Sequence, residues 1–289
     1  MKNVYFLIIS LILVSLINAP SSAERLVENS GFFKDVKKLV EHKELNKKEI
    51  EKKIIDNKTI GKTLNVTKEF GRSLKGIDLS RIYAKEVAFV DADMRKAILD
   101  LGNFEKSYFV ACNLSNVSMN ASDFSYAVIL DSNLSNAKIK IATLDYATLV
   151  GSDLSGAVIE GTNLSYSNLS NVNLKGATLI NVDLAGANLQ GANLDGAKLK
   201  NVNLQSANLL GANLNSTIIV NSNMQNANLV NSSLKETTFE YVDLRKADLR
   251  WTRLSKANLV NTDISRAKTH PLLYESDDFQ ISIDAMSSK

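Results

Sequence analysis

Residues 187–196 read Ala-Asn-Leu-Gln-Gly-Ala-Asn-Leu-Asp-Gly, which is two copies of one five-residue unit. Outward from this stretch in both directions, an apolar residue occupies every fifth position from Leu74 to Ile264. In nearly every unit a small or β-branched residue stands two positions earlier, as Ala187 and Ala192 do. The unit is therefore A(N/D)LXX, in which we call the leucine position i and the alanine position i−2.

A period of five residues fits neither regular element. A strand alternates every two residues, and a five-residue repeat would spiral around a helix. The chain must instead turn once per unit, with positions i and i−2 inside and the other three positions in water. Stacked turns can pair their backbones at about 4.8 Å and bury a continuous core that no single unit could bury. The sequence therefore predicts a solenoid.

With these units the chain resembles the pentapeptide-repeat family, and the stretches 187–191, 192–196 and 207–211 match the family motif closely. The resemblance covers residues 74–268, about two thirds of the chain. It implies an all-β fold, a right-handed quadrilateral β-helix solenoid with four units, or twenty residues, in each coil. It implies little about function, because one fold carries many functions.

The N-terminal residues predict export. Residues 1–23 have the form of a signal peptide, because Lys2 precedes an apolar run over 4–17 and small residues at 21–23 offer a cleavage site. The run is shorter than the roughly 20 residues of a membrane span. An uncleaved membrane anchor is the alternative. We expect an exported protein with no membrane span after cleavage, periplasmic or extracellular if the source is bacterial.

Residues 24–73 predict a helical N-terminal cap segment, since they are rich in lysine and glutamate and their apolar residues have helical spacing. One helix is expected over 32–40. A second should begin after Asn46, with Ile50, Ile54 and Ile55 on its apolar side. Such a segment would cover the open end of the solenoid, although a separate partner-binding module is the alternative. Residues 74–268 form the solenoid and 269–289 a C-terminal tail.

The residue types argue against an enzyme. Cys112 is the single cysteine and falls at an inward i−2 position, where a small core residue is expected. His42 and His270 flank the repeats at opposite ends, so they cannot build a metal cluster or a Ser/His/Asp set. Carboxylate pairs such as Asp91 with Asp93 follow from a motif that often places Asp before the leucine. We predict no catalytic residue, no metal site and no cofactor.

The charge of the repeats bears on one known activity of the family. Some members, linked to quinolone resistance, resemble B-DNA in shape and acidity and bind type II topoisomerases. Residues 74–268 contain 19 Lys or Arg against 18 Asp or Glu. A near-neutral array is a poor copy of a duplex with one negative charge per roughly 1.7 Å, and export would separate it from DNA. A DNA-mimicking topoisomerase inhibitor is therefore the alternative function, and we do not expect nucleic acid binding.

Residues twenty apart should stack into columns along the solenoid, so outward faces can be read from the sequence. Outward positions are normally polar in this motif, yet one region is apolar and aromatic, which is typical of an interaction face. Its members are Tyr108, Tyr126, Val128, Leu130, Tyr146, Val150 and Tyr166. Stacked tyrosines suit a protein partner or a sugar. The alternative is that the N-terminal helices fold back and cover this face.

A second candidate is a basic patch near the end of the repeats. Its members are Lys246, Arg250, Trp251, Arg253, Lys256 and Arg266. Such a patch fits an anionic polymer or the inner leaflet of an envelope, whereas the interleaved aspartates favour a solvated salt-bridge network. Taken together, the residues predict an exported, non-enzymatic, rigid scaffold that binds a protein partner. They are compatible with a monomer or a homo-oligomer.

Overall fold

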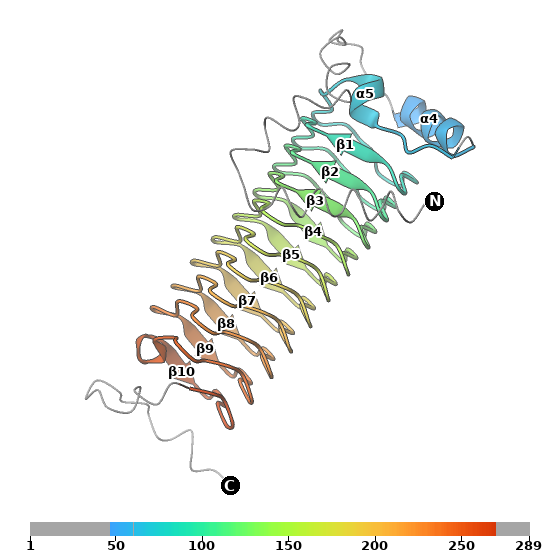
Figure 1. Ribbon diagram of the computed structural model, residues 1–289. Helices are drawn as coiled ribbons and strands as arrows, with labels where there is room; N and C mark the ends of the chain where they lie inside the picture. Colours follow the sequence, from blue (N-terminus) through green and yellow to red (C-terminus); the bar gives the residue numbers. More distant parts are fainter. Residues whose placement is uncertain (1–46, 60, 270–289) are drawn as a thin grey trace, which may run out of the picture. The chain divides into compact units, whose positions relative to one another are not determined.

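The computed structural model describes residues 47–59 and 61–269 (Figure 1). Two helices come first, α4 over Lys47–Thr59 and α5 over Val66–Phe70. Ten strands follow, each of three residues: β1 Ala88–Val90, β2 Tyr108–Val110, β3 Val128–Leu130, β4 Lys138–Lys140, β5 Val158–Glu160, β6 Thr178–Ile180, β7 Lys198–Lys200, β8 Ile218–Val220, β9 Thr238–Glu240 and β10 Asn258–Val260. A 3₁₀ helix, η2, covers Leu254–Lys256.

Three predictions fall outside the described residues: the signal peptide over 1–23, the helix over 32–40 and the tail from residue 270. No helix in the described ranges is long and apolar enough to cross a membrane.

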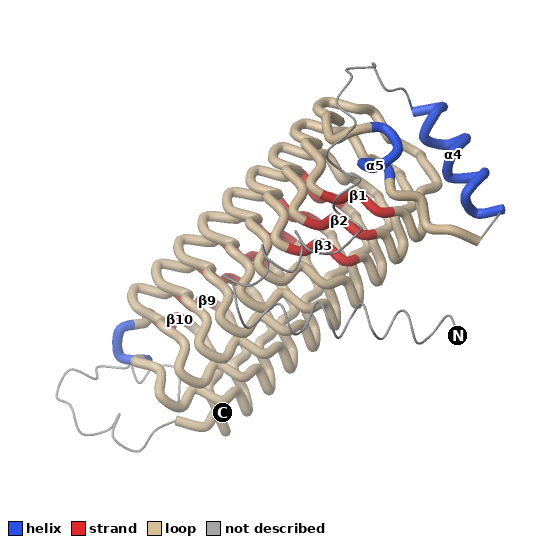
Figure 2. Tube along the Cα trace, turned by 45° about the horizontal axis from the view of Figure 1, so that its top comes forward, coloured by secondary structure: helices blue, strands red, loops and turns tan. Residues whose placement is uncertain are grey.

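The strands form two parallel sheets, and both have a register of twenty residues. The order is β1-β2-β3 in one sheet and β10-β9-β8-β7-β6-β5-β4 in the other. Phe89 pairs with Phe109 in the first, and Ile139 with Ile159 in the second. The centre of β3, Ile129, and that of β4 are two units apart, half a coil, so the two sheets occupy opposite faces of the solenoid. The strands β1–β3 lie together in the coils nearest α4 and α5 (Figure 2). The predicted β-helix is confirmed.

Every unit except the one at η2 turns at its position i+2, where the backbone adopts positive φ. Glycine takes this position at Gly191, with φ of 66°, but so do Asn171 at 56° and the β-branched Ile141 at 55°. A left-handed conformation costs an ordinary residue about 1–2 kcal/mol. Each coil therefore contains strained corners, and the stacking of neighbouring coils must offset the free energy of this strain. The pattern breaks near η2, where Lys256 does not adopt positive φ.

The interior is filled by the residues at positions i and i−2. Most positions i hold Leu or Ile, but the coils around β1–β3 carry phenylalanines instead. Phe89 stacks on Phe109 with ring centroids 4.7 Å apart, and Phe104 stacks on Phe124 at 4.8 Å. Gly102 makes room for this packing, because a Cβ there would lie 2.5 Å from a ring carbon of Phe104.

Asparagine at position i−1 joins successive coils through its side chain. The Asn188 Nδ2 donates to Asn168 Oδ1 at 3.2 Å, and Asn208 Nδ2 donates to Asn188 Oδ1 at 3.0 Å. Asn188 Oδ1 also accepts a hydrogen bond from the backbone N–H of Gln190 at 3.2 Å, and this bond bends the chain into a local turn. Strands β1 to β9 all begin at an i−1 residue that is neither Asn nor Asp. Extended strands therefore form where this side-chain bond is missing.

A column of small polar residues replaces alanine at position i−2 in the coils of β2 and β3. The hydroxyl of Ser132 donates to the carbonyl of Phe109 at 3.2 Å, and the Cys112 thiol makes the equivalent bond to Phe89 at 3.3 Å. The Cys112 backbone N–H in turn donates to Ser132 Oγ at 3.0 Å. Burial raises the pKa of the Cys112 thiol to about 11, so it is a neutral core residue.

Helix α4 packs on the first coils. Ile50 and Ile54 are buried in the same contiguous core as the repeats. The ammonium group of Lys53 pairs with Glu69 at 2.7 Å. The prediction for Ile55 is wrong, because its side chain is 66% exposed. Adjacent helical residues point about 100° apart, so Ile54 and Ile55 do not share one buried face.

Candidate interaction faces

Three tyrosines form a stacked column on one corner of the solenoid, which we call the tyrosine column. The ring centroids of Tyr126 and Tyr146 are 5.1 Å apart with planes 5° from parallel, and those of Tyr146 and Tyr166 are 5.3 Å apart at 11°. All three sit at position i+2 with φ of 56–59°. Their residues are 48–60% exposed. The predicted stacking of residues twenty apart is therefore present here.

Both outer ring faces of the tyrosine column are occupied. At one end the ammonium group of Lys106 lies 5.9 Å from the Tyr126 centroid. At the other end the Tyr166 ring lies over Gly186, where a Cβ would be only 2.7 Å from two ring carbons. Sugar recognition by stacking needs a free aromatic face, and the two outer faces of the column are flanked by Lys106 and by the backbone at Gly186. The surface that remains consists of ring edges, which suit contacts with a protein.

The aliphatic members of the predicted face present much less surface. Tyr108 pairs with Val128 in the β2–β3 register, and both are half-buried. Burial and the negative charge of Glu86 raise the pKa of Tyr108. Leu130 and Val150 are only 6% and 5% exposed, although they do not belong to the contiguous core.

The expectation of an exposed aliphatic column is therefore wrong at Leu130 and Val150. Coils stacked about 4.8 Å apart bring Val110, Leu130 and Val150 side by side, so each side chain shields its neighbour from water. The aromatic corner is the accessible part of this face.

The basic patch is only partly neutralised. The Arg250 guanidinium makes two bonds to Asp248, at 2.9 and 2.7 Å, and this holds the pKa of Asp248 below its ordinary value. Trp251 is 64% exposed. Within residues 47–269, apart from residue 60, no ion pair reaches Lys246, Arg253, Lys256 or Arg266. The predicted salt-bridge network thus accounts for Arg250 and not for the other cations.

A third face lies where the sequence departs from the uniform A(N/D)LXX unit. The outward side chains of β6, β7 and β8, which we call the β7 face, are Thr178, Ile180, Lys198, Lys200, Ile218 and Val220. The sequence marks this face at position i−1, which is Thr, Lys or Ile in these strands instead of Asn or Asp. Both lysines are exposed, and so is Ile218, at 43%.

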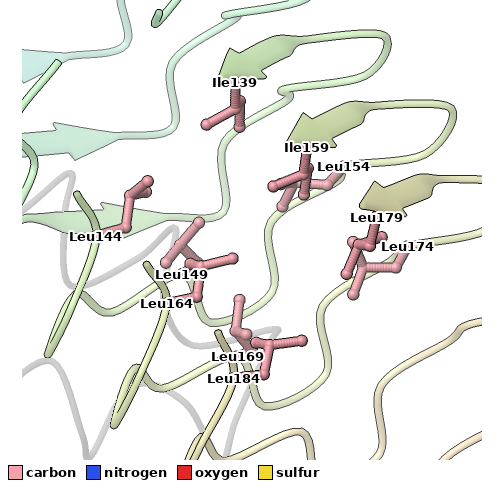
Figure 3. A pocket seen from close by; sticks show the side chains of 10 residues that line it. All are labelled: Ile139, Leu144, Leu149, Leu154, Ile159, Leu164, Leu169, Leu174, Leu179 and Leu184. Atoms are coloured by element: carbon pink, nitrogen blue, oxygen red, sulfur yellow. The ribbon is translucent and has the colours of Figure 1, made fainter. Parts of the chain in front are cut away.

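The interior of the solenoid contains a narrow apolar cavity. It is lined by Ile139, Leu144, Leu149, Leu154, Ile159, Leu164, Leu169, Leu174, Leu179 and Leu184 (Figure 3). These side chains come from successive units and carry no polar atom. Among the described residues there is no cluster of three or more His, Cys, Asp or Glu side chains that could hold a metal ion.

The coil of twenty residues, the five-residue period and the stacked side-chain ladders define a pentapeptide-repeat solenoid. The family model for pentapeptide repeats matches eight copies, over residues 103–140, 142–176, 167–205, 197–235 and 232–268. These ranges cover more than half of the chain, which therefore belongs to the pentapeptide-repeat family. Among curated proteins, none matches the chain significantly.

Several solved structures are similar to this chain. QnrB1, a plasmid-mediated fluoroquinolone resistance protein, is 14% identical over 66% of this chain and 95% of its own, with a TM-score of 0.45. HetL, a pentapeptide repeat protein involved in heterocyst differentiation regulation in Nostoc sp. strain PCC 7120, is 26% identical over 78% of this chain and 94% of its own (TM-score 0.26). A pentapeptide repeat protein of the Arabidopsis thaliana thylakoid lumen is 28% identical over 31% of this chain and 63% of its own (TM-score 0.31).

Proposed function

We propose that this protein is an exported, non-enzymatic scaffold that binds a protein partner through the edges of its tyrosine column. The observation that carries the proposal is the column itself. Tyr126, Tyr146 and Tyr166 are about half exposed, yet each is fixed by stacking. Tyrosines held in one orientation lose little conformational entropy on binding, and tyrosine is enriched among residues that dominate binding energy.

The apolar interior supports a non-enzymatic role. The cavity lining is purely apolar. The one cysteine among the described residues is buried, and its raised pKa keeps it protonated at neutral pH. A scaffold role needs only a rigid backbone and fixed surface side chains, and these are what the stacked coils supply.

The binding test removes the three tyrosine rings and keeps the positive-φ turns of the backbone. A triple variant, Tyr126→Asn, Tyr146→Asn and Tyr166→Asn, keeps a residue type that tolerates positive φ. The matched control is Tyr241→Asn, since Tyr241 has φ of 53° at the same unit position and is 56% exposed. Partners are crosslinked in the native compartment and quantified by mass spectrometry.

We expect the triple variant to lose at least nine tenths of a crosslinked partner that the parent and the control retain. Circular dichroism must show that the variant still folds. Recovery of the same partners in the same amounts by the triple variant would mean that the tyrosine column is not the binding site.

Export is proposed from the pattern of residues 1–23 and is tested separately. Mass spectrometry of the protein isolated from its native source should find a mature N-terminus immediately after Ala23. An intact N-terminus in the membrane fraction would instead support the uncleaved anchor.

The alternative function is inhibition of a type II topoisomerase through DNA mimicry. The near-neutral charge of the repeats argues against DNA mimicry. A gyrase supercoiling assay with purified protein decides between the two functions: we expect no inhibition, and inhibition at stoichiometric protein would favour the alternative.

A further inference from the structure

The β7 face places two lysines on one short strand. In β7 the central Leu199 is 1% exposed and points into the core, so Lys198 and Lys200 on either side of it both point outward. Lys198 pairs with Thr178 and Ile218 in the flanking strands, and Lys200 pairs with Ile180 and Val220. The two ammonium groups thus project from the middle of a sheet surface whose nearest outward neighbours are all uncharged.

Three other lysines of the solenoid, Lys85, Lys140 and Lys175, each pair with a carboxylate in the same column one coil later. Lys175 pairs with Asp195 at 2.9 Å, and Lys140 pairs with Glu160, also at 2.9 Å. The corresponding places after Lys198 and Lys200 are taken by Ile218 and Val220.

Neither β7 lysine forms an ion pair with any described residue. In the column of Lys200, Glu160 and Glu240 each lie two strands away, and Glu160 is already engaged by Lys140. The β7 face therefore combines two uncompensated positive charges with β-branched apolar side chains, a combination that fits a partner with complementary charge.

We propose that the β7 face binds an extended acidic segment of a partner protein, in which two carboxylates lie two residues apart between apolar residues. The proposed match rests on the equal spacing of the two lysines and the two carboxylates. Alternate residues of an extended chain are about 6.8 Å apart, which is also the separation of Lys198 and Lys200 along β7. Successive side chains of an extended chain point to opposite sides, so a segment lying in the gap above β7 and β8 would direct its two carboxylates toward the lysines and its intervening apolar side chain toward Ile218 and Val220. This inference rests on the proposed scaffold function but uses a separate face.

A protein segment fits this face better than nucleic acid. Two lysines neutralise only two phosphates, whereas nucleic acid binding draws its affinity from many such contacts. The apolar side chains of Ile180, Ile218 and Val220 would meet no complementary surface on a phosphate backbone.

The test uses the full chain and two blocked synthetic peptides, Ser-Val-Glu-Val-Glu-Val-Ser and its Gln-for-Glu counterpart. Each is titrated into ¹⁵N-labelled protein at low salt, and amide chemical shifts are followed by NMR. We expect the acidic peptide to shift amides of β6, β7 and β8 and to bind at least tenfold more tightly than the glutamine peptide. The double variant Lys198→Gln, Lys200→Gln should reduce this affinity at least tenfold, while Lys175→Gln should leave it unchanged.

Three results would overturn the proposal: equal binding of both peptides, shifts confined to other faces, or full binding by the double variant. Sedimentation equilibrium adds a fourth, because a dimer of the parent that the double variant loses would assign the face to a second copy of the chain. None of these results changes the tyrosine-column experiment, so failure here and failure of the scaffold function remain distinguishable.

Discussion

Gly186 follows Tyr166 in its column and offers a sharp test of the stacking. Gly186 has φ of 65°, and a Cβ added there would lie 2.7 Å from two carbons of the Tyr166 ring. Gly196 has φ of 66° and nothing within 4 Å of an added Cβ. The variants Gly186→Ala and Gly196→Ala therefore share the backbone penalty and differ in the contact with the neighbouring coil.

The expected magnitudes follow from these two terms. A left-handed alanine costs about 1–2 kcal/mol, and the reduced entropy of the unfolded chain returns about 0.4–1 kcal/mol. Gly196→Ala should thus lower the free energy of unfolding by at most about 1.6 kcal/mol. Gly186→Ala adds an overpacking cost of about 1–3 kcal/mol, because the Tyr166 ring is held against Tyr146 and cannot move without loosening that stack.

Urea unfolding followed by circular dichroism measures both variants, alone and in a Tyr166→Gly background. Removing the ring should make Gly186→Ala as mild as Gly196→Ala, which corresponds to a coupling energy of about 1–3 kcal/mol between positions 166 and 186. Equal costs for the two glycine variants, or a Gly186→Ala cost that persists without the ring, would refute the stacking argument.

Three further changes test the coil. Asn188→Ala removes three hydrogen bonds and should cost about 1–3 kcal/mol in urea unfolding, whereas Gln190→Ala should cost less than about 0.5 kcal/mol; equal costs would contradict the ladder. The Cys112 pKa is raised to about 11, so the native thiol should resist iodoacetamide at pH 8 and react only after unfolding. Because the folded thiol holds its proton to higher pH than the unfolded one, stability should fall between about pH 9 and 11, and a Cys112→Ser variant should lack that loss. Leu189→Asp, which buries a charge in the core, should abolish cooperative thermal unfolding, whereas Gln190→Asp should leave the melting temperature within a few degrees.

The five-residue period was sufficient to predict the solenoid, its inward positions and the stacking of residues twenty apart. The reason is physical: a unit that turns once every five residues has one way to bury its leucine, and repetition enforces the same solution in each coil. The tyrosine column follows directly, since Tyr126, Tyr146 and Tyr166 differ by twenty residues.

Two features needed the structure. The burial of Leu130 and Val150 depends on how neighbouring side chains cover one another, which the spacing alone does not reveal. The β7 face does not follow from the A(N/D)LXX unit, which places Asn or Asp at position i−1. Residues such as Lys198 at that position lack the side-chain bond that bends the backbone, and the resulting strands present flat outward surfaces.

The central claim is that coils of twenty residues hold surface side chains in rigid, evenly spaced columns. Pulsed electron paramagnetic resonance measures this directly, with spin labels on cysteines placed at Lys138 and Ile218, or at Lys138 and Asn258, in a Cys112→Ser background. These positions share one outward column, four and six coils apart. We predict narrow distance distributions near about 19 Å and about 29 Å, from about 4.8 Å per coil. Broad distributions, or a separation that does not grow in proportion to the number of coils, would contradict the account.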